Sequence, residues 1–369
     1  MNLLALAEKL TKKHYTPAQQ ANIMGDISGA FLAHAVDDSL RAHSASGGAV
    51  TAILVHLLES GQIDGALVNE AYVEDGVVKN RFLIAANRAD LLRAQGSKYM
   101  AVRFSAQALP LIRQFDGRLA VVALPCDTAI LRAALQRDEA LAQKVIWLIS
   151  LFCGHNSLPE LTQHIVAKHT RGKDSPLTAF HYRVGHWRGE MCLSFADDSH
   201  TMLPFESFST YQNLFFFCEK KCLYCHDHFG YASDISAGDV WLSAMKEAAV
   251  KPTALLARSQ RSATLLQACI DLGVLQAEPM EPSLVLQSQA RSVRGHYNLS
   301  ARSKAGKLLG IKIPDTLHAK VNLFDWLTAM IILFNYRLST KAWGKKLIFT
   351  LPRPLLKLYL YLFKGIESL

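Results

Sequence analysis

Two apolar runs of strand length, each followed by a cysteine, constrain the fold of this chain more than any other feature. Leu119–Leu124 (LAVVAL) precedes Pro125-Cys126, and Val145–Phe152 (VIWLISLF) precedes Cys153-Gly154. Uninterrupted apolar runs of this length are typical of strands buried on both faces of a sheet. A helix predicted over Thr128–Leu135 lies between them, and strand–helix–strand succession indicates parallel pairing. The sequence therefore predicts an α/β fold with a mixed, largely parallel sheet flanked by helices.

The surrounding sequence supplies further elements of this fold. A long apolar helix is predicted over Ala49–Ser60. Gly65–Val73 has the composition of a strand, and Asp75-Gly76 is a strong signal for a hairpin turn into a return strand. Residues 176–217 are less regular and richer in strand-like sequence. We expect them to form a strand-containing insertion that carries a cluster of cysteines.

The net charge of +9 is confined to the C-terminal end of the chain. Residues 301–369 hold 12 lysines and arginines against 3 aspartates and glutamates, so the remainder is neutral overall. A nucleic-acid-binding protein is expected to carry a basic patch on its folded body, and this distribution argues against that class. Half of the residues are apolar, which excludes a disordered chain.

The start of the chain and its cysteine content indicate a reducing compartment. The segment Met1–Leu10 carries Glu8 and Lys9 and lacks a small-residue cleavage site, unlike a secretory leader. We therefore expect a cytoplasmic protein. Seven cysteines in that compartment do not indicate a disulfide framework. Three of them lie within eight residues, which indicates metal binding.

The cysteine cluster is Cys218-EKK-Cys222-LY-Cys225. Thiolates at this spacing can converge on zinc or on an iron–sulfur cluster from a single loop. A zinc site could recruit His226 or His228 as its fourth ligand. A four-iron cluster needs four cysteines, and the strand-end residues Cys126 and Cys153 could complete the set, because neighbouring parallel strands end at a shared crevice. Either strand-end cysteine could instead be a small core residue.

Three other segments are candidates for binding a ligand. Ser44, Ser46, Gly47 and Gly48 precede the Ala49–Ser60 helix, whose N-terminus could accept a phosphate or could simply be capped by serine. The turn of Gly96, Ser97, Lys98 and Tyr99 offers a flexible backbone, a cation and a ring, or is a surface turn. Asp239, which follows a glycine, could accept a hydrogen bond from a ribose or ribityl hydroxyl, or could form an Asx turn. No nucleotide class follows from these spacings alone.

Five segments in order resemble one family: Arg41–Leu54, Gln95–Met100, Val121–Arg132, Leu148–Gly154 and Cys222–Trp241. Together they resemble the beta subunits of coenzyme F420-reducing hydrogenase and of related dehydrogenases. The resemblance implies a flavoprotein oxidoreductase that passes electrons between one 4Fe–4S cluster and FAD, with hydride exchange to a small organic substrate. It aligns Cys126, Cys153, Cys222 and Cys225 with the cluster ligands, Cys218 being an alternative ligand. It matches Ser46–Gly48 and Gly96–Tyr99 with segments that contact the flavin.

The chain also departs from this family at its N-terminal end. Many members carry an N-terminal ferredoxin-like segment with further cysteines, whereas here no cysteine precedes Cys126. A separate protein is therefore expected to donate or accept the electrons. Relatives also occur in bacterial polysaccharide loci, so the alternative function is a non-catalytic, metal-bearing assembly protein of a surface-polysaccharide biosynthesis system.

A length of 369 residues favours two domains with an appendage. We expect the following parts: an N-terminal helical segment (1–40), an N-terminal flavin-binding part (41–118), a C-terminal α/β part with the iron–sulfur site (119–290), a linker (291–322) and a basic amphipathic tail (323–369).

The tail combines apolar, aromatic and basic residues. Leu323–Phe334 is apolar over twelve residues with one aspartate, which is shorter than a membrane-spanning helix. The lysines and aromatic residues that follow suit helices lying in a membrane interface. Pro352 and Pro354 favour two short helices over one. We therefore expect peripheral membrane contact, the alternative being that the tail packs on the body or on a partner subunit.

Overall fold

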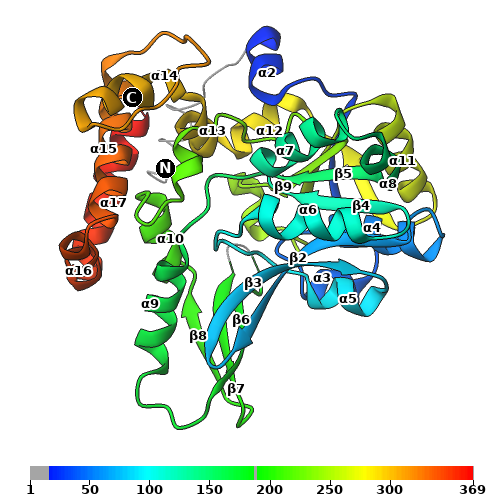
Figure 1. Cartoon of the computed structure of the whole chain (residues 1–369), viewed down its shortest axis with the longest axis horizontal. Helices are drawn as coiled ribbons and strands as arrows, with labels where there is room; N and C mark the ends of the chain where they lie inside the picture. The colour runs from blue at the N-terminus through cyan, green and yellow to red at the C-terminus, as the bar shows by residue number, and fades with distance from the viewer. Residues whose placement is uncertain (1–15, 187–188, 369) are drawn as a thin grey trace.

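The computed structural model describes residues 16–186 and 189–368, and its main element is an eight-stranded sheet (Figure 1). The strand order is β11-β1-β10-β9-β5-β4-β2-β3. Strands β2, β4, β5 and β9 pair with one another in parallel. The pairs β2–β3, β9–β10, β10–β1 and β1–β11 are antiparallel. The predicted α/β fold with a mixed sheet and a parallel centre is confirmed. The strand bounds are β1 (Gly29–Ala35), β2 (Gly65–Glu74), β3 (Val77–Ala85), β4 (Leu119–Ala123), β5 (Val145–Leu151), β9 (Ile235–Asp239), β10 (Thr253–Ala257) and β11 (Leu275–Pro279).

Helices cover both faces of the sheet, which explains the uninterrupted apolar runs. In β4, Leu119 and Val121 pack under helices of one face, while Ala120 packs under those of the other. Every residue of such a strand therefore meets an apolar neighbour. The first face carries α6 (Phe104–Gln114), α7 (Pro125–Leu135) and α8 (Glu139–Lys144), and the second carries α4 (Ala49–Glu59) and α11 (Gln260–Asp271). Shorter helices are α2 (Pro17–Met24), α3 (Asp38–Ala42), α5 (Arg88–Arg93) and α12 (Pro282–Ser288).

The predicted insertion forms a second, three-stranded antiparallel sheet. It comprises β6 (Leu177–Val184), β7 (Glu190–Phe195) and β8 (His200–Pro204), and is flanked by α9 (Pro159–Thr170) and α10 (Glu206–Asn213). The β2–β3 hairpin extends from the large sheet to contact β6. Its turn is the one predicted, with positive φ angles of 52° at Asp75 and 72° at Gly76. The cysteine cluster follows α10 in a short 3-10 turn, η1 (Lys220–Leu223), and a similar turn, η2 (Ser243–Glu247), follows β9.

The start of the chain differs from the helical expectation for residues 1–40. Within the described part, α2 is helical, but Gly29–Ala35 forms β1, hydrogen-bonded between β10 and β11. The alanine-rich sequence of β1 has helical propensity, but pairing with two neighbouring strands overrides it. The first part of this expected helical segment, residues 1–15, lies outside the described residues.

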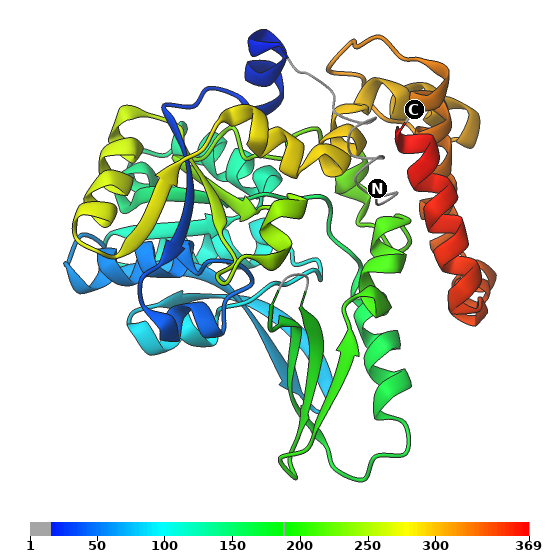
Figure 2. The same ribbon diagram turned by 180° about the vertical axis from the view of Figure 1, so that it is seen from behind.

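The C-terminal region is helical throughout most of its length (Figure 2). The expected linker, 291–322, instead forms most of α13 (Ala290–Tyr297) and all of α14 (Leu299–Leu309). The tail forms three helices rather than two: α15 (Leu323–Ser339), α16 (Ala342–Thr350) and α17 (Arg353–Ser368), with the predicted break at Pro352. Figure 1 shows α15 and α17 beside α9 and α10, at the opposite end of the molecule from α11.

The tail packs on the body through an apolar face. Leu333 of α15, Ile348 of α16 and Phe363 of α17 are buried in the same cluster as Leu161 of α9 and Phe208 of α10. This contact corresponds to the alternative of a tail that packs on the body. Among residues 16–186 and 189–368, no helix combines the length and apolar character needed to cross a membrane.

Candidate functional site

Four cysteines line one small cavity at the edge of the large sheet. Cys126 lies in the first turn of α7, directly after β4, and Cys153 follows β5. Because β4 and β5 are neighbouring parallel strands, both cysteines reach the same sheet edge. Cys222 lies in turn η1, Cys225 follows two residues after it, and both line the same cavity. The structure thus brings together the four cysteines that the sequence analysis selected.

Burial outweighs the nearby positive charges for most of these thiols, although Lys221 also lines the cavity. Burial raises the pKa of Cys126 and Cys153 above the usual range, and raises that of Cys225 to about 11. Cys222 is the exception, because a hydrogen bond from Cys218 and another from the backbone N–H of Asn156, at 3.4 Å, lower its pKa. Bound metal would supply the positive charge that the thiolate forms need.

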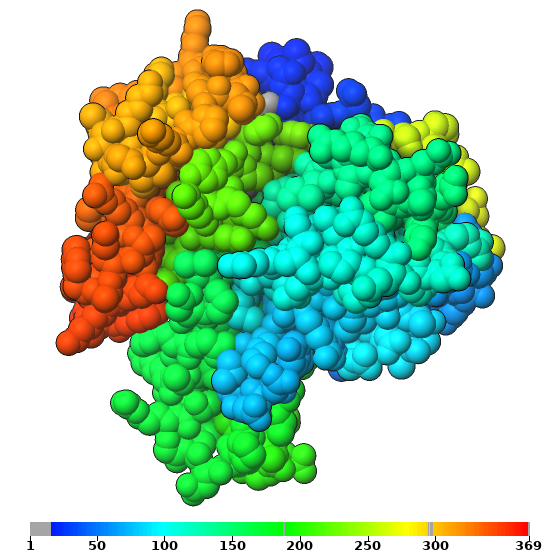
Figure 3. Space-filling model, viewed as in Figure 1, coloured from blue at the N-terminus to red at the C-terminus, as the bar shows by residue number. Residues whose placement is uncertain are grey.

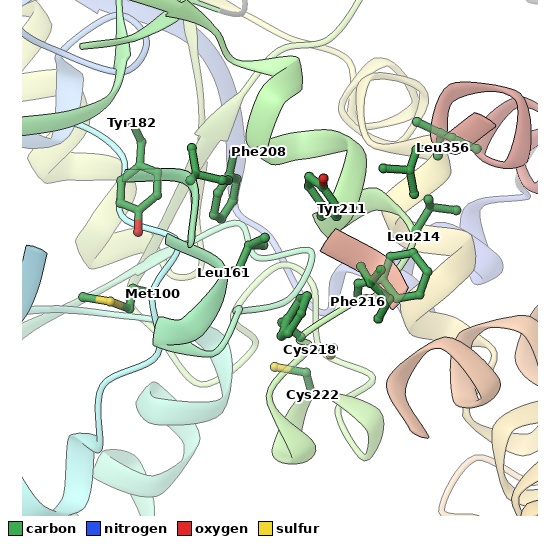
Figure 4. Close-up of a cluster of buried hydrophobic side chains, with 14 of the residues drawn as sticks. Met100, Leu161, Tyr182, Phe208, Tyr211, Leu214, Phe216, Cys218, Cys222 and Leu356 are labelled. Atoms are coloured by element: carbon green, nitrogen blue, oxygen red, sulfur yellow. The ribbon is translucent and has the colours of Figure 1, made fainter. Parts of the chain in front are cut away.

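Cys218 lies behind Cys222 and does not line the cavity. It is fully buried in an apolar cluster beside Phe216, and Figure 4 shows it next to Cys222. Its thiol lies 3.4 Å from the carbonyl oxygen of Glu219. This position suits a residue that supports Cys222 rather than a fourth ligand.

The geometry does not favour a mononuclear zinc site. Within the described residues, no three His, Cys, Asp or Glu side chains converge closely enough to hold a single metal ion. His228 contacts the carbonyl oxygen of Cys153 through Nδ1, at 2.9 Å, and Oε1 of Gln289 through Nε2, at 3.2 Å. Burial lowers the pKa of His228 to about 4, so the ring is neutral and has one N–H, and donation from Nδ1 would orient the backbone of Cys153.

A second cavity, of about 700 Å³, adjoins the first. Cys153 and His155 line both cavities, so only a shared wall separates them. Eight of the nine residues expected at a ligand site line the second cavity: Ser44, Ser46, Gly48, Gly96, Ser97, Lys98, Tyr99 and Asp239. Its wall also includes Ala49, Val50 and Thr51 of the first turn of α4. Backbone N–H groups in a first helical turn have no acceptor within the helix, which suits them to an anion.

Gly47 has a packing role that differs from the expected one. Its N–H donates to Oγ1 of Thr253 at 3.0 Å, and its carbonyl oxygen accepts from the N–H of Ala35 at 2.7 Å. A Cβ atom at this position would lie 2.7 Å from the carbonyl oxygen of Ala33. Gly47 therefore allows the start of α4 to approach β1 closely. Gly48, with φ of 73°, supplies the left-handed turn into the helix.

Lys98 lies in the cavity wall, and its ammonium group points toward the backbone of the residues just before it in the chain. Its Nζ donates to the carbonyl oxygens of Ala94 and Gln95, the latter at 3.0 Å. Burial lowers the pKa of Lys98 to about 7. Tyr99 packs its ring edge-on against Tyr182, with centroids 5.3 Å apart. This turn therefore offers a cation that can respond to an anionic ligand.

Asp239 is ion-paired, through a residue that the sequence analysis missed. Arg183 of β6 contacts Oδ2 of Asp239 through Nη1 at 2.5 Å, and its Nη2 donates to the carbonyl oxygen of Ala45 at 3.2 Å. The arginine side chain is 3% exposed, and its guanidinium lies 5.0 Å from the ring centroid of Trp241. No local pattern marks Arg183, because a single charge in an alternating strand is ordinarily solvent-exposed.

His155 is a second missed residue. Its ring stacks on Phe215 with centroids 4.3 Å apart, and burial lowers its pKa to about 4. Within the described part of the chain, its buried Nε2 has no hydrogen-bond partner. A neutral imidazole thus forms part of the wall between the two cavities.

The C-terminal helix also contributes to the larger cavity. Lys364 and Glu367 of α17 line it, together with Arg291 of α13. Nε of Arg291 contacts Oε2 of Glu367 at 2.7 Å. The tail is therefore part of the site as well as of the core.

Comparisons with known proteins agree with this architecture. The model of the coenzyme F420 hydrogenase/dehydrogenase beta subunit N-terminus matches residues 30–108, and that of the C-terminus matches residues 116–283. The coenzyme F420 hydrogenase subunit beta of Methanothermobacter thermautotrophicus is 24% identical over 302 residues, which cover 77% of this chain and 98% of the relative. The coenzyme F420-dependent sulfite reductase of Methanocaldococcus jannaschii is 33% identical over 141 residues, covering 33% of this chain and 21% of the relative.

A solved structure shares the fold. A chain of the F420-reducing [NiFe] hydrogenase complex from Methanosarcina barkeri superposes with a TM-score of 0.61 at 18% identity, covering 82% of this chain and 99% of that chain. Both family models match in sequence order and together span the large sheet, the small cavity and the insertion, while part of the wall of the larger cavity lies beyond residue 283. The chain therefore belongs to the coenzyme F420 hydrogenase/dehydrogenase beta subunit family, a family of oxidoreductase subunits.

Proposed function

We propose that this protein is an iron–sulfur flavoprotein oxidoreductase. Cys126, Cys153, Cys222 and Cys225 would hold one 4Fe–4S cluster in the small cavity, and FAD would occupy the larger one. The observation that carries the proposal is the shared wall: Cys153 lines both cavities, so electrons need to cross only one layer of residues. When bound, the cluster supplies one-electron transfer, and the flavin couples it to hydride exchange with an organic substrate.

The donor set supports a cluster. Four thiols from three separate segments converge on one cavity, and thiolate sulfur is the ligand that iron–sulfur clusters take in proteins. The N–H of Asn156 and the thiol of Cys218 direct hydrogen bonds to Cys222. Such hydrogen bonds hold a ligand sulfur in place and tune the cluster.

The wall of the larger cavity supports a flavin dinucleotide. The first turn of α4 presents backbone N–H groups for the diphosphate, and Lys98 can add a positive charge from the facing turn. A ligand that draws the ammonium group away from Ala94 and Gln95 would offset the cost of its burial. The volume of about 700 Å³ is in the range of cofactor sites.

The proposal includes a separate electron-carrying protein and a small-molecule substrate. The relatives named above are a subunit of a coenzyme F420 hydrogenase and a coenzyme F420-dependent sulfite reductase. Coenzyme F420, a deazaflavin, is therefore the first substrate to test with this protein. The proposed location is cytoplasmic.

Anaerobic purification followed by absorbance spectroscopy and assay of iron, sulfide and flavin tests the proposal. We expect four irons, four sulfides and one FAD per chain, by the stoichiometry of a single cubane. Cys126→Ser should lose the absorbance near 400 nm, whereas Cys192→Ser and Cys269→Ser should retain it, because neither of these cysteines lines the small cavity. Iron without flavin would favour the alternative of a metal-bearing assembly protein, and a colourless zinc protein would exclude the iron–sulfur flavoprotein.

We also propose peripheral membrane contact through the outer face of α16 and α17. Trp343 is 65% exposed and Tyr361 is 66% exposed, and Leu355, Leu358 and Leu362 are also exposed. Figure 3 shows these helices, in orange and red, forming one side of the molecular surface. The net charge of the C-terminal region is complementary to an anionic lipid surface.

Flotation with anionic liposomes at low salt tests this contact. Truncation of the tail is unsuitable, because it would remove the buried face of α17 from the core. A triple variant with serine at Trp343, Leu358 and Tyr361 leaves that buried face intact and should stay at the bottom of the gradient. The control Leu272→Ser removes an equally exposed leucine from a distant helix end and should float like wild type. Equal behaviour of wild type and the triple variant would refute the contact.

A further inference from the structure

A buried arginine from the C-terminal region lies against the cysteine turn. Arg302 of α14 is 2% exposed and heads the set of largest fully buried side chains. Its Nη2 donates to the carbonyl oxygen of Cys225 at 2.6 Å, and its Nη1 donates to the carbonyl oxygen of Gly295 at 2.5 Å. One guanidinium thus joins turn η1 to α13.

The charge of this arginine is close to the proposed ligands. The guanidinium of Arg302 contacts the carbonyl oxygen of Cys225, which is one of the proposed ligands. An arginine guanidinium stays charged at neutral pH. Since Cys222 and Cys225 line the small cavity, a fixed positive charge lies directly behind one side of it.

We propose that Arg302 is a positioning residue for the cluster: it fixes the Cys222–Cys225 turn against α13, and its charge raises the reduction potential of the cluster. The proposal rests on the proposed function. A 4Fe–4S cluster with four thiolate ligands is negatively charged and gains a further negative charge on reduction. A nearby cation in a water-poor environment stabilises the reduced form more than the oxidised form.

The shape of the side chain matters as well as its charge. A planar guanidinium presents several N–H donors in a fixed arrangement, so it can hold two carbonyl groups at once, whereas a lysine ammonium on a flexible stem holds them less well. Helix α14 lies beyond residue 283, where the family match ends. The C-terminal helices would thereby set a property of a centre whose ligands all lie in the matched region.

A redox titration monitored by electron paramagnetic resonance tests the proposal on four proteins: wild type, Arg302→Gln, Arg302→Lys and the control Lys304→Gln. Lys304 is exposed on the same helix, so its replacement makes the same change in charge away from the cavity. We expect a lower midpoint potential in Arg302→Gln and no shift in Lys304→Gln. Arg302→Lys should keep a midpoint close to that of wild type but release iron faster to a chelator, because the turn is held less firmly.

The outcomes separate the two proposals. A wild-type protein without a cluster would overturn both. A wild-type cluster with an unchanged midpoint in an iron-replete Arg302→Gln protein would overturn the role of Arg302 alone. If Arg302→Gln retains no iron, Arg302→Lys decides: faster iron release supports the role, and release and midpoint both equal to wild type overturn it.

Discussion

The replacement Lys98→Met tests whether the turn of Gly96–Tyr99 is built to meet an anion. Lys98 lies in the cavity wall, and burial lowers its pKa from 10.5 to about 7. In the unfolded chain the same group keeps its ordinary pKa. Between pH 7 and about 10.5 the unfolded chain therefore binds a proton that the folded apoprotein does not. The stability of the apoprotein therefore rises with pH through this window. The free-energy cost of burying Lys98 is largest below pH 7.

The magnitude follows from the pKa difference. One pKa unit corresponds to about 1.4 kcal/mol, so raising the pH from 7 to 9 relieves about 2 kcal/mol of the cost of burying Lys98. Lys98 is only partly buried, so solvent screens its charge and this is an upper value. The stability advantage of Lys98→Met over wild type should therefore shrink by up to about 2 kcal/mol between these pH values.

Urea unfolding of both apoproteins at pH 7, 8 and 9 measures this difference. The pH dependence that comes from titratable groups present in both proteins cancels in the difference. The matched control is Lys304→Met, an exposed lysine whose replacement should leave the difference flat. In the same proteins, FAD should bind about 10- to 100-fold more weakly to Lys98→Met, because a charge-assisted hydrogen bond is lost. Wild-type affinity should fall as pH rises above 7. A pH-independent stability difference together with equal FAD affinity would refute the reasoning.

Three further replacements probe the frame of the site. Gly238→Ala should destabilise by about 1–3 kcal/mol in urea unfolding, because its Cβ would lie 2.1 Å from the Phe152 ring; equal stability would contradict this packing. Arg183→Met should cost about 3–5 kcal/mol by leaving Asp239 without its cation, and adding Asp239→Asn should recover part of that loss; a double variant no better than the single would argue against the pair. Gly47→Val should lower the unfolding midpoint, because the new side chain would clash with β1. Loss of FAD at unchanged stability would instead indicate that Gly47 takes part in ligand binding.

The sequence predicted the elements whose signals are local. β4 and β5 are marked by apolar runs bounded by a proline or a glycine, and strand-end placement then follows from the geometry of parallel sheets. This reasoning places Cys126 and Cys153 at one edge of the sheet from the sequence alone. The hairpin turn at Asp75-Gly76 was predictable for the same reason, since left-handed backbone favours those residues.

The residues that were missed depend on contacts distant in sequence. Arg183 meets Asp239 only because the insertion sheet folds against the end of β9. Arg302 lies in a polar segment with glycine and serine, which has the composition of a linker, and it is buried only because α13 and the cysteine turn surround it. Strand β1 was missed because its small apolar residues suit a helix when considered alone, and its strand form depends on β10 and β11.

A series of short polar contacts also connects the two cavities, which bears on how the site would work. The carbonyl oxygen of Cys153 contacts His228, His228 contacts Gln289, and Nε2 of Gln289 donates to the carbonyl oxygen of Asp239 at 2.6 Å. The backbone on the cysteine side is thus held to the backbone at the end of β9, and Asp239 is in turn held by Arg183. Electron transfer between two centres requires a fixed separation. Contacts that hold the backbone at Cys153 to the backbone at Asp239 therefore suit the proposed function better than two independently mobile sites.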